Sequence, residues 1–139
     1  MIILDTNVLS ELMKPQGFPK IKTWVAQQIR AELFITTITQ AEILYGISII
    51  PEGRRKQGLM ETAQIMFTED FKEKILDFDT TSAYYYAIIA SERRQEGKPI
   101  SQFDAQIASI CRTHKAILAT RNVNDFINCQ IEIINPWNL

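Results

Sequence analysis

The chain has 139 residues and carries 15 Lys and Arg against 16 Asp and Glu, a formal net charge of −1 at pH 7. Its length predicts one domain over residues 1–139, with a core that needs no disulfide staples. A hydrophobic fraction of 46% with 22% charged residues argues against disorder. The nearly balanced charge excludes a strongly basic nucleic-acid binder of the histone type.

The two cysteines, Cys111 and Cys129, form no Cys-x-x-Cys motif and are too few for a disulfide framework. Asp5 interrupts the short apolar start before a secretory h-region can form. No apolar run approaches the roughly 18–20 residues of a membrane span. We therefore expect a cytoplasmic protein with no membrane contact.

Short apolar runs alternate with helical patterns along the chain. In order, the patterns predict a strand at 2–4, helices at 8–13 and 20–30, a strand at 33–36, helices at 39–49 and 58–67, a strand at 75–78, helices at 82–96 and 101–114, and strands at 117–119 and 131–134. Strands separated by helices predict βαβ units and a parallel sheet. Because the strands lack polar alternation, both faces should be covered. The expected fold is α/β, a central, mostly parallel sheet of about five strands with helices on both faces.

Acidic residues occupy similar places in several of these units. Asp5 directly follows the first strand, Glu42 lies in the first turn of the helix after the second, Asp104 lies in the first turn of the helix at 101–114, and Asp125 follows the fourth strand. Ligands of open parallel sheets bind outside the carboxyl ends of the strands. Residues far apart in sequence could therefore share one crevice.

Each acid also has a structural interpretation. Thr39 to Glu42 matches a helix capping box, and Ser101 to Asp104 nearly does. Against this, Glu42 shares a helical stripe with apolar residues, namely Ile38, Ala41, Tyr45 and Ile49. A carboxylate on an apolar face costs free energy unless something compensates its charge.

A hard divalent cation would compensate several clustered carboxylates, which otherwise repel one another and gain protons. Mg²⁺ prefers oxygen ligands, keeps several waters and needs only one or two direct carboxylates. Such a centre suits phosphodiester hydrolysis, because it neutralises phosphate charge and lowers the pKa of an attacking water.

Five segments carry a resemblance to a known family. They are residues 3–11 (ILDTNVLSE), 39–46 (TQAEILYG), 104–108 (DAQIA), 118–126 (LATRNVNDF) and 134–137 (INPW). In this order and spacing the chain resembles, end to end, a PIN-domain ribonuclease of the VapC/FitB toxin type. The resemblance implies a Mg²⁺- or Mn²⁺-dependent endoribonuclease, inhibited by a cognate antitoxin and usually assembled as a homodimer. It implies RNA as substrate, with tRNA a candidate, and contact with DNA only through the antitoxin.

The resemblance also implies the site residues. The acidic quartet falls on Asp5, Glu42, Asp104 and Asp125, with Asp5 and Asp104 as direct metal ligands and the other two bound directly or through water. Polar residues that would line the same pocket are Thr6, Asn7, Thr120 and Asn122, and Arg121 lies between the last two. The fourth acidic role is open between Asn122 and Asp125, and we favour Asp125.

Alternatives remain at this point. A receiver-like signalling domain could use Asp79 as phosphoacceptor, although Asn135 and Pro136 stand where a Lys is wanted. A metal phosphatase would want a second acid where Asn7 stands, and a non-catalytic PIN-like RNA-binding module also stays open. The basic pair Arg93 and Arg94 is interpreted as a solvated helix face, with a contact to the phosphate backbone as the alternative.

Overall fold

The computed structural model describes residues 1–139. In chain order the elements are β1 (Ile2–Leu4), α1 (Thr6–Met13), α2 (Pro19–Gln27), β2 (Leu33–Thr36), α3 (Thr37–Ser48), α4 (Arg54–Ile65), β3 (Ile75–Leu76), α5 (Thr80–Gln95), α6 (Gln102–His114), β4 (Ile117–Ala119) and β5 (Glu132–Ile134). Short helical turns are η1 (Arg30–Glu32), a π-helical η2 (Met66–Asp70), η3 (Val123–Phe126) and η4 (Pro136–Asn138). Every predicted strand and helix is present.

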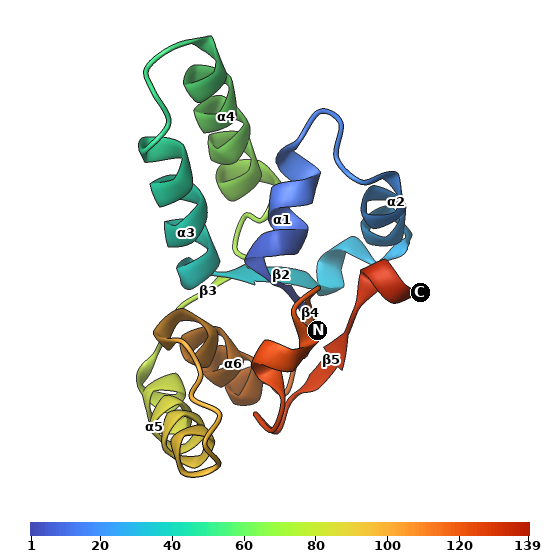
Figure 1. Cartoon of the computed structure of the whole chain (residues 1–139). Coiled ribbons are helices and arrows are strands. Elements are labelled where there is room, and N and C mark those ends of the chain that lie inside the picture. The colour runs from blue at the N-terminus through green and yellow to red at the C-terminus, as the bar shows by residue number, and fades with distance from the viewer.

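The five strands form one sheet in the order β3-β2-β1-β4-β5, with all neighbours parallel. Parallel neighbours need crossover connections, and the helices supply them. In Figure 1, α1 to α4 lie on the upper side of the sheet and α5 and α6 on the lower side. The expected α/β architecture, with helices on both faces, is confirmed.

Residues of the central strands alternate between two hydrophobic cores. Leu4 and Ala119 point to a core of 15 buried residues shared with α1 to α4. Ile3 and Leu118 point to a core of 10 buried residues shared with α5 and α6. Successive strand side chains point to opposite faces, so an apolar run is the pattern of a strand covered on both sides. This burial holds the carboxyl ends of β1 and β4 in place.

Helix α3 differs from expectation at its start and on its faces. It begins at Thr37, because the Thr36 hydroxyl accepts the backbone N–H of Thr39, so the predicted capping box beginning at Thr39 is wrong. Glu42 consequently lies in the second turn. The expected apolar stripe is also largely exposed, with Tyr45 at 68%, whereas Ile43 is buried in the core. Packing against α1 and α4 decided which side of this apolar helix is covered.

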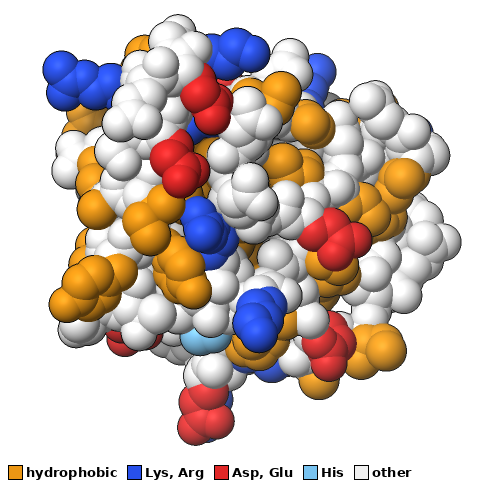
Figure 2. Space-filling view, turned by 90° about the horizontal axis from the view of Figure 1, so that it is seen from below, with side chains coloured by type: hydrophobic (Ala, Val, Ile, Leu, Met, Phe, Trp, Pro, Cys, Tyr) orange, Lys and Arg blue, Asp and Glu red, His pale blue; other side chains and the backbone are white.

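Helices α5 and α6 pair on the lower side of the sheet. Figure 2 shows this side from below, with hydrophobic side chains gathered on its left among a few charged groups. Among the large apolar side chains of these two helices, Tyr84 and Ile88 of α5 and Phe103 of α6 are exposed. None of the helices has both the length and the apolar character that crossing a membrane requires.

Candidate functional site

The site lies where the three central strands β2, β1 and β4 end. Thr36 is the last residue of β2, Asp5 directly follows β1, and Thr120 directly follows β4. All three are buried. The backbone N–H of Asp5 extends the pairing of β1 with β4 by donating to the carbonyl of Ala119 at 2.9 Å. Parallel pairing therefore brings side chains more than a hundred residues apart to one edge of the sheet.

Asp5 is a buried carboxylate held by three donors. Its Oδ1 accepts the backbone N–H of Thr6 at 2.8 Å, and its Oδ2 accepts the Thr120 hydroxyl at 2.7 Å and the Asn7 amide at 3.4 Å. Burial nevertheless raises its pKa from 3.8 to about 6, against the lowering effect of the Thr120 and Thr6 hydrogen bonds. The charges of Asp104 and Glu42 add to the rise.

Glu42 reaches the same place from α3. The Thr6 hydroxyl donates to its Oε1 at 2.8 Å and so accepts from the Thr39 hydroxyl, 3.1 Å away. Partial burial raises the pKa of Glu42, and the nearby charge of Asp104 raises it further. Thr6 thus connects Asp5, through its backbone, to Glu42, through its side chain.

Asp104 interacts through its charge with the other three acids. It lies in the first turn of α6, where its backbone N–H donates to the Ser101 hydroxyl at 3.2 Å, so the predicted cap is confirmed. Burial raises its pKa, and the charge of Asp125 acts in the same direction, whereas Ser101 and Arg93 lower it. Because Asp104 also raises the pKa of Asp5 and Glu42, one electrostatic cluster contains all four acids.

Arg93 fixes the loop that carries Asp125, and here the sequence interpretation was wrong. Its side chain is only 4% exposed, not solvated. The guanidinium donates to the carbonyls of Lys98 at 2.7 Å, Asp125 at 2.9 Å and Ile127 at 2.9 Å. Spacing gave a signal: Arg93 follows the buried Ile89 by four residues on one face of α5. Asp125 itself is exposed.

Three of the polar residues predicted for the pocket form a network around Asp5. Besides bonding Asp5, the Thr120 hydroxyl accepts the backbone N–H of Asn122 at 3.1 Å and lies 3.4 Å from the Asn7 amide. The side-chain Oδ1 of Asn7 accepts the backbone N–H of Arg121 at 3.4 Å. The Arg121 side chain is exposed, with its guanidinium 5.6 Å from the centre of the Trp137 ring. The Asn122 side chain is exposed rather than bonded to the acids.

The donor set fits a hard divalent cation that keeps part of its water. Carboxylate and hydroxyl oxygens are its preferred ligands, and mutual repulsion of the acids is what a cation would relieve. No three acidic, cysteine or histidine side chains lie close enough to surround one ion. The arrangement therefore suits one or two direct carboxylates, with the remaining acids acting through water.

Two shallow grooves adjoin the acids. One, of about 250 Å³, runs from Thr6 and Glu42 past Lys14 and Arg55, between α1, α3 and α4. The other, of about 560 Å³, begins at Asp125, and polar or charged residues make up six of the seven that line it. A negatively charged polymer could pass over the acids only with cations nearby, and Lys14, Arg55 and Arg121 provide them.

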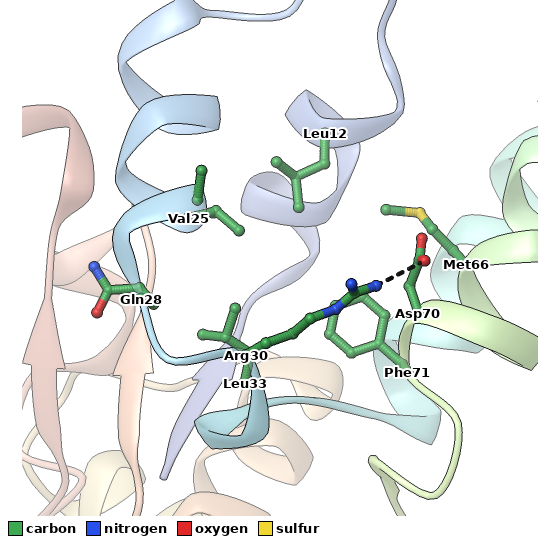
Figure 3. A pocket seen from close by; sticks show the side chains of 9 residues that line it. Leu12, Val25, Gln28, Arg30, Leu33, Met66, Asp70 and Phe71 are labelled. Atoms are coloured by element: carbon green, nitrogen blue, oxygen red, sulfur yellow. Dashed lines mark hydrogen bonds and ion pairs between the residues drawn. The ribbon is translucent and has the colours of Figure 1, made fainter.

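A third cavity is lined mainly by hydrophobic residues. It has about 440 Å³ and lies between α1, α2, β2 and η2, where none of the four acids lines it. Figure 3 shows Leu12, Val25 and Phe71 around it, with Arg30 paired to Asp70 at 3.2 Å across its rim. It is not part of the acidic site.

The alternatives based on other acids lose support. Asp79 accepts the backbone N–H of Ser82 at 2.9 Å as the N-cap of α5, and this role accounts for Asp79 without phosphoacceptor chemistry. Asn7 uses its side chain to bond Asp5 and Arg121 instead of acting as a second acid.

Fold and site together define a class: parallel α/β proteins that gather carboxylates beyond the ends of their central strands. Residues 2–128 match the family profile of the PIN domain, and the chain belongs to this family.

Two relatives and one solved structure are similar along the whole chain. Toxin FitB of Neisseria gonorrhoeae is 33% identical over 138 residues, covering 99% of both chains. The VapC ribonuclease Y4jK of Sinorhizobium fredii is 31% identical over 137 residues, covering 99% of this chain and 98% of the relative. The structure of FitAB bound to a DNA fragment superposes with a TM-score of 0.93 at 34% identity, covering 100% of this chain and 97% of the other.

Proposed function

We propose that the chain is a metal-dependent endoribonuclease and the toxin of a toxin–antitoxin pair, with residues 1–139 acting as one nuclease domain. One observation carries the proposal: Asp5, Glu42 and Asp104 come from three separate segments, yet the charge of Asp104 raises the pKa of both others. Similarity to a protein named a VapC ribonuclease and to one named a toxin supports the same reading of this cluster.

Asp5 and Asp104 would hold Mg²⁺ or Mn²⁺ directly, and Glu42 and Asp125 would act on it through water, since no three of the acids lie close enough to surround one ion. When bound, it supplies charge neutralisation for the phosphate and lowers the pKa of a water molecule. The protein's own groups position the acids. Thr120 and the backbone of Thr6 orient Asp5, and the Thr6 hydroxyl orients Glu42. RNA is the substrate, and tRNA is the first pool to test.

The partners follow from similarity to FitB and to FitAB bound to DNA. A cognate antitoxin inhibits the enzyme, and DNA is reached only through that antitoxin. A homodimer is the expected assembly. Exposed apolar side chains suited to burial occur on α3, at Tyr45 and Ile49, and on α5, at Tyr84 and Ile88.

Cleavage assays on purified protein test this function. Wild-type protein should cut RNA with Mg²⁺ or Mn²⁺, lose the activity in EDTA and regain it when metal is restored. Asp104→Asn should abolish cleavage without loss of folding by circular dichroism, whereas Glu61→Gln, which changes an exposed acid on α4, should not. Undiminished cleavage in chelator refutes the metal role. RNA binding without cleavage by the wild type would leave the non-catalytic alternative.

A further inference from the structure

The polar groove beside Asp125 has an unusual lining. The chain contains six asparagines, and four of them, Asn122, Asn124, Asn135 and Asn138, line this one groove of about 560 Å³. Arg121 and Asp125 supply its only charges. A volume of this order is within the range of about 300–1,000 Å³ that small-molecule sites occupy. Two segments, one around η3 and one around η4, contribute the amides.

The amide groups are available for a ligand. The backbone, not the side chain, of Asn122, Asn124 and Asn138 makes the hydrogen bonds found within the chain. The side-chain oxygen of Asn135 accepts the backbone N–H of Trp137 at 3.0 Å, which leaves its NH₂ group. Each free amide offers a donor and an acceptor side by side, the pattern that pairs with the edge of a nucleobase.

Arg121, which lines the groove, brings a planar guanidinium to it. The Arg121 guanidinium lies 5.6 Å from the centre of the Trp137 ring. Guanidinium planes and aromatic rings are the surfaces on which unpaired RNA bases stack. Arg121 also brings positive charge to a place where the phosphate backbone must pass the acids.

Hydrogen bonds from neighbouring elements fix the backbone of the loop that carries Asn122 and Asn124. Arg93 bonds the carbonyls of Asp125 and Ile127, and Thr120 and Asn7 bond the backbone on either side of Arg121. Fixing the backbone in advance reduces the entropy lost when a ligand is bound. The same contacts tie the groove to Asp5, because Thr120 donates to that carboxylate.

We propose that this groove is a base-binding subsite, in which the side-chain amides of Asn124 and Asn138 read one unpaired base of the RNA strand next to the phosphodiester bond that is cut at the acidic site. The proposal rests on the proposed function and deepens it by naming the residues that select the cleavage position. The edge of the base contacts the amides and its face contacts the Arg121 guanidinium. The phosphate of the same nucleotide lies at the end of the groove nearest the acidic site.

Nucleotide binding tests the subsite without any need for activity. Isotope-labelled Asp104→Asn protein is titrated with AMP, GMP, CMP and UMP in EDTA, and the side-chain amide signals of asparagine are followed by NMR. One or two of the four nucleotides should shift the amides of Asn124 and Asn138. The Asn124→Ala/Asn138→Ala double variant should bind them about tenfold more weakly. Gln57→Ala, which removes an exposed amide on α4, should bind as before.

Sequencing of RNA ends then connects the subsite to cleavage. With a random-sequence RNA, wild-type enzyme should prefer a base at one position flanking the cut, and the double variant should flatten that preference. Equal shifts by all four nucleotides, or an unchanged preference in the double variant, overturn the subsite while leaving the nuclease standing. If the double variant loses antitoxin affinity but keeps nucleotide binding, the groove is a protein contact and the proposal is wrong. Absence of any cleavage refutes the proposed function separately, since nucleotide binding is measured independently.

Discussion

Replacing Asp5 by Asn should make the metal-free protein more stable at alkaline pH while destroying its activity. The fold buries this carboxylate and raises its pKa to about 6, so the ionised form is the unfavourable one. An amide of nearly the same shape carries no charge to desolvate and meets no repulsion from Asp104 and Glu42. The variant therefore removes a cost that the wild type bears for its site.

The magnitude follows from the two pKa values. A group with a pKa of 3.8 when unfolded and about 6 when folded favours the folded state only in its protonated form. Below pH 3.8 there is no penalty; as pH rises through about 6 the penalty grows to about 3 kcal/mol. At pH 5 it is roughly half of that. Asn has one acceptor oxygen where Asp has two, and both Asp5 oxygens accept hydrogen bonds, so the loss of the bond from Thr6 or Thr120 offsets about 1 kcal/mol. This leaves a gain of about 2 kcal/mol at pH 8.

Urea unfolding in EDTA at pH 5 and pH 8 measures this gain. Asp5→Asn should exceed the wild type by about 2 kcal/mol at pH 8 and by clearly less at pH 5. Glu61→Gln is the matched control, since its exposed carboxylate should give the same small difference at both values. Adding Mg²⁺ should stabilise the wild type and not the variant. A difference that is independent of pH, or a less stable variant at pH 8, would refute the burial argument.

Three further changes have defined outcomes. Arg93→Met should lower the free energy of unfolding by about 3–5 kcal/mol in urea, because three carbonyls lose a buried charged donor. Thr120→Val should move the acidic limb of the cleavage pH profile, measured at low Mg²⁺, to higher pH. The Thr120 hydrogen bond lowers the pKa of Asp5 in the wild type, so its removal raises that pKa. Tyr45→Glu with Tyr84→Glu should give a monomer by sedimentation at concentrations where the wild type is a dimer, because a charge on an exposed apolar face opposes its burial.

Matched variants make each of these outcomes specific. Arg94→Met, on the exposed side of α5, should change stability by less than about 0.5 kcal/mol; an equal loss would contradict the bonding role of Arg93. Thr120→Ser keeps the hydroxyl and should show the wild-type pH profile. An acidic limb that does not move in Thr120→Val would contradict the effect of the Thr120 hydroxyl on the pKa of Asp5. If the wild type sediments as a monomer at micromolar concentration, the proposed homodimer is refuted.

The sequence was sufficient for the order of the elements, and it supplied the four acids of the proposed site. Strands covered on both faces have no polar alternation, and helices have a period near 3.6, so local pattern alone separated the two. Asp5 and Asp104 could be placed because each follows a recognisable boundary, a strand end or the Ser101 cap. Where a boundary signal was ambiguous, as at Thr36 and Thr39, the predicted start of α3 was wrong by two residues.

Only the tertiary structure decided which faces are buried and which distant groups meet. Helix α3 is apolar on both sides, so its own sequence could not say that Ile43 would pack inward and Tyr45 outward. The bonds from Arg93 to the Asp125 loop and the meeting of the η3 and η4 asparagines join segments that are separate along the chain. Periodicity reports the environment of one element, whereas contacts between elements depend on strand order and on how the loops return to the sheet, and these are set by the packing of the whole chain.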